Sequence, residues 1–445
     1  MIRPTLQTAK SERLSYGGFF LGQNMIYVLQ LQFLVYFYTE YVGLTLGATT
    51  LMLLVARLWD AINDPIMGAI VDKCNFKRGK YLPWIRAATI LVPLSTFLLF
   101  VELDASYTTK LIYAYATYLL WDMMYTVSDS PIFSLSTVMT SNLYERDKLQ
   151  AYGRVAAAIA AITSAAFMSM KGMLGWQGAV GVYCLVAFLV MVPLSFTAKE
   201  RIVHRSSEQL SFVRLFLYLF KNKYLLIFYA GYLAINGTNT LQIVAVYFAN
   251  SNLGDEGLLT IILATTILPV ILIAPLLPAM IQKLGKKRLT IYSCLLAIAL
   301  SILQYFAGYE SFGLFLALST VRVMVMQIPL LIYGMFTADC IEYGAAVNGE
   351  RAVGIAFSLQ TLVTKLTGAL AATLVLTLMS YFGYVEQSSH QTESALEGIW
   401  IILTLVPAIG YVGMLIAMYF YRLDERAVAV YMEANLKRSE VEQHG

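Results

Sequence analysis

Two aspartates stand four residues apart inside an apolar run that extends from about Ala48 to Val71. A helix that crosses a bilayer needs about 20 apolar residues, so this run is long enough to span a membrane. The spacing places Asp60 and Asp64 on one face of such a helix, with Asn63 beside them. An ionised carboxylate at the bilayer centre costs about 3 kcal/mol on insertion scales, so acids found there usually belong to an ion or substrate pathway.

A second polar pair occupies another long apolar segment. Thr126 and Asp129 are three residues apart, so a hydroxyl and a carboxylate share one helix face. Sodium and lithium are hard cations that bind several oxygen ligands, at least one of them charged. Together with Asp60, Asn63 and Asp64, this pair has the chemistry of a cation site. In the alternative interpretation the acids only hold helices together, by pairing with Arg57, Arg154 and Lys365.

The composition is that of a polytopic membrane protein. Of the 445 residues, 59% are hydrophobic and 13% are charged, whereas soluble proteins carry about 25% charged residues. We therefore predict an all-α membrane protein. Its twelve predicted transmembrane segments are 16–39, 48–72, 82–102, 109–140, 151–171, 178–197, 224–250, 258–281, 288–308, 311–338, 353–382 and 396–421.

Basic residues gather in the loops after the even-numbered segments, whereas the opposite loops hold only Lys110 and Lys171. The positive-inside rule therefore predicts that both termini are cytoplasmic. The predicted parts are an N-terminal six-helix bundle at 1–197, a cytoplasmic central loop at 198–223, a C-terminal six-helix bundle at 224–421 and a cytoplasmic tail at 422–445. Residues 211–222 are either a helix on the inner membrane surface or an ordinary loop.

Weak internal similarity links the two halves at an offset of about 200 residues. The stretch Asp129-Ser-Pro131 aligns with Gln327-Ile-Pro329, and Arg154 aligns with Arg351. This consistent offset favours a duplicated six-helix unit. The acids did not follow the duplication, since Gln327 stands opposite Asp129.

Four motifs are similar to those of a known family. They are Arg57-Leu-Trp-Asp60-Ala-Ile-Asn63-Asp64-Pro-Ile-Met-Gly68, Gly79-Lys80-Tyr-x-Pro83-Trp84, Tyr125-Thr-Val-Ser-Asp129-x-Pro131 and Ala338-Asp339-x-x-Glu342-Tyr-Gly344. With twelve segments and a basic central loop, the chain resembles the glycoside–pentoside–hexuronide:cation symporters, the melibiose permease group of the major facilitator superfamily. The resemblance covers almost the whole chain. It implies the major facilitator fold, with two pseudo-symmetric six-helix bundles and alternating access, and a coupling cation held by Asp60, Asn63, Asp64, Thr126 and Asp129, with Na⁺ at the three acids.

The resemblance also implies a sugar site. Its residues are Asn24, Tyr125, Asp129, Phe133, Arg154, Gln360, Thr361 and Lys365. Three positions depart from the family pattern, because Asn24 replaces a carboxylate, Gln23 replaces a lysine and Phe133 replaces a tryptophan. An amide binds a sugar diol more weakly than a carboxylate does, so the departures count against a neutral galactoside. An acidic sugar such as a hexuronide stays open as the alternative cargo.

Further polar residues suggest a gate and a discontinuous helix. An inner gate closed by cytoplasmic ion pairs is expected at Asp72, Arg78, Asp339, Glu342 and Arg351. The polar, glycine-broken stretch Asn236-Gly-Thr-Asn239 lies in the seventh segment, and discontinuous helices often line a transport path. Arg322 has no family counterpart, and it either pairs with an acid or meets an anionic substrate.

The sequence therefore predicts a secondary active symporter of the inner (cytoplasmic) membrane. It would couple inward movement of Na⁺, or of H⁺ or Li⁺, to uptake of a glycoside, oligosaccharide or hexuronide. The alternatives are a cation-coupled carrier of a non-sugar amphiphile such as a lysolipid, and a membrane sensor that binds a sugar without moving it. No enzyme chemistry, cofactor other than the coupling cation, or nucleic-acid partner is expected, and the protein is predicted to be a monomer in lipid.

Overall fold

The computed structural model describes residues 7–444 except 75, 77–78, 141, 202–211, 274, 349–352 and 389. Within helices, the side chains of Arg57, Asp64, Asp72, Arg154, Thr361 and Lys365 also lie outside the described part. The regular structure that is described is helical, apart from one bridge between Phe76 and Gly79. The chain divides into two compact units. Unit 1 is Met1–Gln209, Ala249–Ile261 and Tyr384–Gln391, and unit 2 is Leu210–Phe248, Ile262–Gly383 and Thr392–Gly445.

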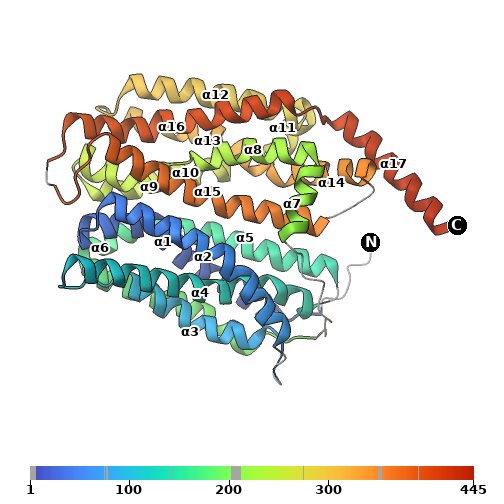
Figure 1. Cartoon of the computed structure of the whole chain (residues 1–445), viewed down its shortest axis with the longest axis horizontal. Helices are drawn as coiled ribbons and strands as arrows, with labels where there is room; N and C mark the ends of the chain where they lie inside the picture. The colour runs from blue at the N-terminus through green and yellow to red at the C-terminus, as the bar shows by residue number, and fades with distance from the viewer. Residues whose placement is uncertain are drawn as a thin grey trace. The chain divides into compact units, whose positions relative to one another are not determined.

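Unit 1 contains six long helices (Figure 1). They are α1 (Lys10–Tyr36, continued by the π-helix η1 at Phe37–Val42), α2 (Leu46–Lys73), α3 (Leu82–Leu99), α4 (Tyr107–Met139), α5 (Leu143–Ala165) and α6 (Phe167–Thr197). Helix α1 packs against α5 and α6, while α4 packs against α2 and α3. The helices that carry the predicted cation ligands, α2 and α4, are therefore direct neighbours.

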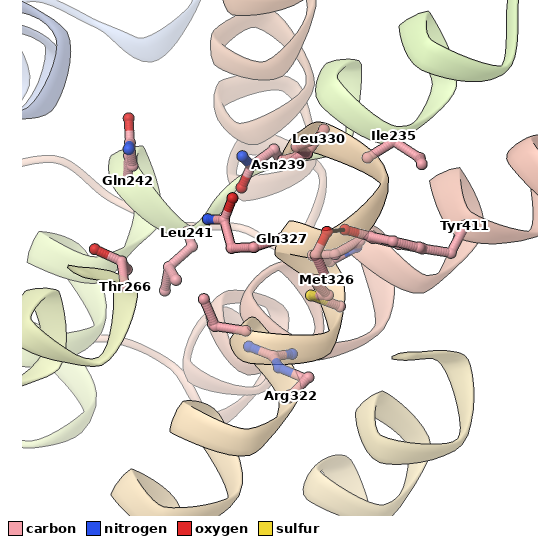
Figure 2. Close-up of a pocket in the computed structure, with 12 residues that line it drawn as sticks. Ile235, Asn239, Leu241, Gln242, Thr266, Arg322, Met326, Gln327, Leu330 and Tyr411 are labelled. Carbon is pink, nitrogen blue, oxygen red and sulfur yellow. Dashed lines mark hydrogen bonds between the residues drawn. The ribbon is translucent and has the colours of Figure 1, made fainter. Parts of the chain in front are cut away.

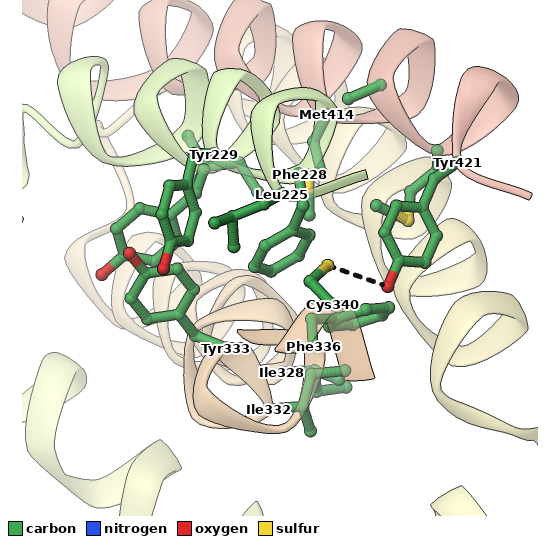
Figure 3. Packing of buried hydrophobic residues seen from close by; sticks show 14 of the residues in the cluster. Leu225, Phe228, Tyr229, Ile328, Ile332, Tyr333, Phe336, Cys340, Met414 and Tyr421 are labelled. Atoms are coloured by element: carbon green, nitrogen blue, oxygen red, sulfur yellow. Dashed lines mark hydrogen bonds between the residues drawn. The ribbon is translucent and has the colours of Figure 1, made fainter. Parts of the chain in front are cut away.

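Unit 2 contains more and shorter helices. They are α7 (Phe212–Lys221), α8 (Lys223–Gly237), α9 (Leu241–Tyr247), most of α10 (Leu259–Ile273), α11 (Leu277–Leu284), α12 (Lys286–Ala307), α13 (Phe312–Leu331), α14 (Tyr333–Asn348), α15 (Val353–Tyr381), α16 (Glu393–Phe420) and α17 (Glu425–His444). Helix α8 packs against α15 and α16. Part of the core is aromatic, since the rings of Phe228 and Phe336 stack with centroids 4.6 Å apart and Tyr421 lies beside them (Figure 3).

Helix breaks divide two of the predicted segments. Seven described helices are long and apolar enough to cross a membrane, namely Lys10–Val42, Leu82–Leu99, Phe167–Thr197, Lys286–Ala307, Phe312–Val347, Leu362–Tyr381 and Glu393–Phe420. The predicted seventh segment is divided into α8 and α9, and the predicted eighth into α10 and α11. Of the two possibilities for residues 211–222, the structure has the helix, α7.

A carboxylate holds the turn before α3. Glu200 accepts hydrogen bonds from the backbone N–H groups of Lys80 (2.7 Å), Tyr81 (2.7 Å) and Leu82 (2.8 Å). It thereby satisfies donors at a helix N-terminus and opposes the positive end of the helix dipole. Gly79 enters this turn with φ of 111°, and a Cβ there would lie 2.6 Å from a Glu200 oxygen. Part of the second sequence motif thus serves to position α3.

Gly79→Ala is expected to lower the melting temperature of the purified protein. The new methyl group would force a left-handed backbone on alanine and displace Glu200, and such strain costs about 1–3 kcal/mol. Gly47→Ala is the matched control, because a Cβ at Gly47 meets nothing within 4 Å. Thermal unfolding in detergent measures both variants, and an unchanged melting temperature for Gly79→Ala would contradict this account of the turn.

The start of α5 is anchored by a fully buried acid. Glu145 accepts hydrogen bonds from the N–H of Thr8 (2.8 Å) and the hydroxyl of Thr140 (2.7 Å), and it lies 3.6 Å from Arg13. Burial acts to raise the pKa of Glu145, but the hydrogen bonds from Thr8 and Thr140 outweigh it and hold the pKa below its usual value. The anchor ties the beginning of α1 to α5.

Two short segments from the second half of the chain belong to unit 1. They are residues 249–261 and 384–391. Glu256 accepts a hydrogen bond from the ammonium group of Lys171 at 2.5 Å. Glu40 accepts hydrogen bonds from the hydroxyl of Tyr384 and the backbone N–H of Gln387, both at 3.0 Å. Unit 1 is therefore completed by residues that follow α6 at long distance along the chain.

Candidate functional site

Helices α2 and α4 bring two residues of the predicted cation site into contact. The side-chain amide of Asn63 donates a hydrogen bond to the Thr126 hydroxyl at 3.1 Å, and both residues are buried. Thr126 donates in turn to the backbone carbonyl of Asp122 at 3.1 Å. Helical spacing places Asp60 one turn from Asn63 and Asp129 one turn from Thr126, both half-buried. Amide, hydroxyl and carboxylate oxygens are thus gathered where α2 meets α4.

The predicted Na⁺ ligands fall only partly within the described structure. Asp60 and Asp129 are described, whereas the side chain of Asp64 is not. Among the described residues, no three His, Cys, Asp or Glu side chains form a metal-binding group. The described set suits a hard monovalent ion, which accepts neutral amide and hydroxyl oxygens beside a carboxylate. Na⁺ at Asp60, Asp64 and Asp129 stays a prediction.

Asp129 is held from α1 by Gln23. The Gln23 amide donates a hydrogen bond to an Asp129 oxygen at 3.2 Å, and Gln23 is only 1% exposed. The neighbouring Asn24 donates instead to the carbonyl of Phe20 in its own helix at 2.8 Å. The family resemblance had placed Asn24 at the sugar and had given Gln23 no role beyond that of a replaced lysine. An adjacent polar pair in an apolar helix was the available signal for Gln23.

Aromatic rings lie one turn to either side of Asp129 on α4. Tyr125 stacks on Trp121 with ring centroids 5.2 Å apart, and Phe133 meets Phe20 edge-to-face at 5.3 Å. Phe133 is 47% exposed. An exposed ring beside a carboxylate can cover the apolar face of a sugar while the carboxylate accepts its hydroxyl protons.

Asp122 was not predicted from the sequence. It is buried in α4 and lies four residues before Thr126 and seven before Asp129, so the three share one helix face. This spacing could have revealed it, since it repeats the pattern that identified the α2 acids. It adds a carboxylate to the polar stripe of α4.

Unit 2 has a pocket at the break between α8 and α9 (Figure 2). Its volume is about 40 Å³, and its lining residues are Ile235, Asn239, Leu241, Gln242, Thr266, Arg322, Val323, Met326, Gln327, Leu330, Pro407 and Tyr411. The break follows Gly237, within the stretch that the sequence marked as polar and glycine-broken. Asn239 and Gln242 lie on either side of the start of α9, so the break supplies two of the polar lining side chains.

The remaining predicted sugar and gate residues are only partly described. Gln360 is half-buried on α15, where its backbone carbonyl accepts a hydrogen bond from the Tyr333 hydroxyl at 3.3 Å. Asp339 pairs with Lys286, and Glu342 accepts a hydrogen bond from Asn435 at 2.9 Å. Those contacts lie inside unit 2. Outside the described side chains lie Arg154, Thr361 and Lys365 of the sugar site, and Asp72, Arg78 and Arg351 of the gate.

Comparison with known proteins places the chain among membrane transporters. A family described as "MFS/sugar transport protein" matches residues 15–425. The chain is 29% identical to the uncharacterized symporter YnaJ of Bacillus subtilis over 93% of this chain and 92% of that protein. It is 26% identical to the glucuronide carrier protein homolog of Escherichia coli, over 92% of both. The crystal structure of the nucleoside transporter NupG shares the fold, with a TM-score of 0.67 at 12% identity over 92% of this chain and 100% of that one.

Proposed function

Because the chain belongs to the family of MFS/sugar transport proteins, we propose that it is a symporter that uses a sodium gradient to take up a sugar. Its class is that of membrane transporters with the major facilitator fold, not enzymes. Its relatives in Escherichia coli include a protein named as a putative glycoside/cation symporter and one named as a glucuronide carrier protein homolog. The observation that carries the proposal of Na⁺ is the contact between Asn63 and Thr126, one helical turn from Asp60 and Asp129.

In the proposed mechanism the cation binds first to unit 1. Asp60, Asn63, Asp64, Thr126 and Asp129 would supply its oxygen ligands. Both contributing helices, α2 and α4, belong to the same unit, so their packing can keep the ligands close enough to bind an ion. The cation offsets the charge of the carboxylates, and the desolvation cost of those acids falls when it is bound.

Asp129 links the cation to the sugar in this proposal. A carboxylate has two oxygens, so one can bind the cation while the other accepts a hydrogen bond from Gln23 or from a sugar hydroxyl. Tyr125 and Phe133 would cover the sugar ring. Because both ligands use Asp129, each should tighten the binding of the other by the same factor. Alternating exposure of the loaded site would then carry both ligands inward across the inner membrane, with both termini in the cytoplasm.

Uptake by proteoliposomes tests the proposal. The purified protein is reconstituted, and labelled neutral and acidic glycosides are offered with an inward gradient of Na⁺, Li⁺ or H⁺, or with none. We expect accumulation above equilibrium with Na⁺ and collapse of the accumulated pool when a sodium ionophore is added. Uptake that is the same with and without each of the three gradients would refute cation coupling. Sugar binding without accumulation would indicate a sensor, and accumulation of a lysolipid alone would indicate an amphiphile carrier.

A further inference from the structure

We propose that the Arg322 pocket of unit 2 is an anion site that binds the carboxylate group of an acidic sugar. The inference rests on the proposed sugar transport and adds the charge of the substrate to it. It is carried by three observations in unit 2: a buried cation, the use of only part of its hydrogen-bonding capacity, and a cavity beside it that is partly lined by polar side chains.

Arg322 is a buried cation in the middle of an apolar helix. It is 1% exposed and lies ten residues into α13, which begins at Phe312. A guanidinium stays protonated in proteins, so burial does not discharge it. A buried charge without a counter-charge is strongly unfavourable. Binding of an anion beside Arg322 would therefore lower the free energy cost of this buried charge.

The described structure pairs Arg322 with no carboxylate. The ion pairs of the described residues in unit 2 include Lys286 with Asp339, and Arg322 is in none of them. The sequence explains this, because Glu310 is the only acid between residues 262 and 338, and it precedes α13. Residues 353–383 and 398–423 contain no acid. The helices around Arg322 cannot supply an intramolecular counter-charge at its depth.

One part of the guanidinium has a structural role. An Arg322 nitrogen donates hydrogen bonds to the carbonyls of Leu403 (3.1 Å) and Thr404 (3.2 Å) in α16. Pro407 lies four residues after Leu403 and has no N–H, so the Leu403 carbonyl lacks its usual helical donor. That role needs a donor but not a charge, and the Arg322 Nε has no hydrogen-bond partner in the described structure.

The cavity beside Arg322 has the size and lining for a small charged group. Its volume of about 40 Å³ corresponds to roughly three water molecules, at about 10–15 Å³ each. A carboxylate group would fit there. Figure 2 shows the amides of Asn239 and Gln327 facing each other over the pocket, with Arg322 on the same helix as Gln327. Amide N–H groups and a guanidinium are all donors to anionic oxygens.

The test compares matched acidic and neutral sugars. Glucuronate with glucose, and galacturonate with galactose, differ in their charged group and share their ring hydroxyls. Competition for sodium-driven uptake and ligand-induced thermal shifts are measured for the wild type, Arg322→Gln and Arg322→Lys. We expect the wild type to prefer the acidic member of at least one pair. Arg322→Gln should weaken acidic-sugar binding about 100-fold, as loss of a buried charge partner does, and Arg322→Lys should keep part of it.

A second variant covers the case in which Arg322→Gln does not fold. Gln327→Glu leaves Arg322 in place and adds a carboxylate to the pocket. It should therefore weaken the binding of acidic sugars by charge repulsion, and Gln327→Met, which adds no charge, should weaken it much less. If the wild type accumulates neutral sugars with Na⁺ and acidic sugars never compete, the anion site is refuted and the proposed function stands. If no sugar is accumulated at all, the proposed function itself fails. Equal acidic-sugar affinity in wild type, Arg322→Gln and Gln327→Glu would also overturn the inference.

Discussion

We expect Asp129→Asn to abolish sodium-stimulated sugar uptake without loss of expression. The substitution keeps the size of the side chain and an oxygen that can accept the hydrogen bond from Gln23. It removes the negative charge, and loss of one partner from a buried charge pair costs about 3–5 kcal/mol. Because each 1.4 kcal/mol is a factor of ten, sodium affinity should fall by about 100-fold or more.

Sodium titrations of uptake and calorimetry measure this effect. Asp104→Asn makes the same chemical change in an exposed loop before α4 and serves as the control. In the wild type, sodium should tighten sugar binding and sugar should tighten sodium binding by an equal factor. Asp129→Asn should remove that coupling. Wild-type sodium dependence in the variant would exclude Asp129 from the cation site.

Gln23→Lys is expected to inactivate the symporter by replacing the transported cation with a tethered one. In the family pattern a lysine at this position is followed by a carboxylate that offsets its charge, whereas here the next residue is the neutral Asn24. The Gln23 amide nitrogen lies 3.2 Å from Asp129, so an ammonium group there can form an ion pair with the same carboxylate. A charged group held in place acts at a high effective concentration. External sodium would then have to break that pair before it could bind.

Gln23→Met is the matched control, since it keeps the length of the side chain and adds no charge. It loses one hydrogen bond, at a cost of about 1 kcal/mol, and should retain sodium-dependent uptake. Gln23→Lys should show no sodium-induced thermal shift and at most slow, sodium-independent uptake. A normal sodium response in Gln23→Lys would show that Asp129 does not belong to the cation site.

Local spacing was sufficient to predict which polar residues share a face of α2 and which share a face of α4. Residues three or four apart must share a helix face, so Asn63 and Asp60 could be grouped from their positions in the chain alone. The break after Gly237 was also visible, because glycine beside polar residues interrupts an apolar helix. These features depend only on residues close together in the sequence.

Contacts between distant residues could not be predicted in the same way. Gln23 and Asn24 are adjacent on an apolar helix, and a helix that is apolar on all sides gives no pattern to show which faces a neighbour. Glu200 reaches Leu82 across 118 residues of sequence. Predicting the hydrogen bond from Arg322 to the Leu403 carbonyl would have required knowing that α13 lies near the proline of α16.

The two late segments of unit 1 have a consequence for biosynthesis. Glu256 is made 85 residues after Lys171, which at about 5–20 residues per second is a delay of roughly 4–17 seconds. Gln387 follows Glu40 by 347 residues, so that contact waits until most of the chain has left the ribosome. During this interval the first six helices must reside in the membrane without these partners for Lys171 and Glu40. The half of the protein that is synthesised first is therefore among the last parts to be completed.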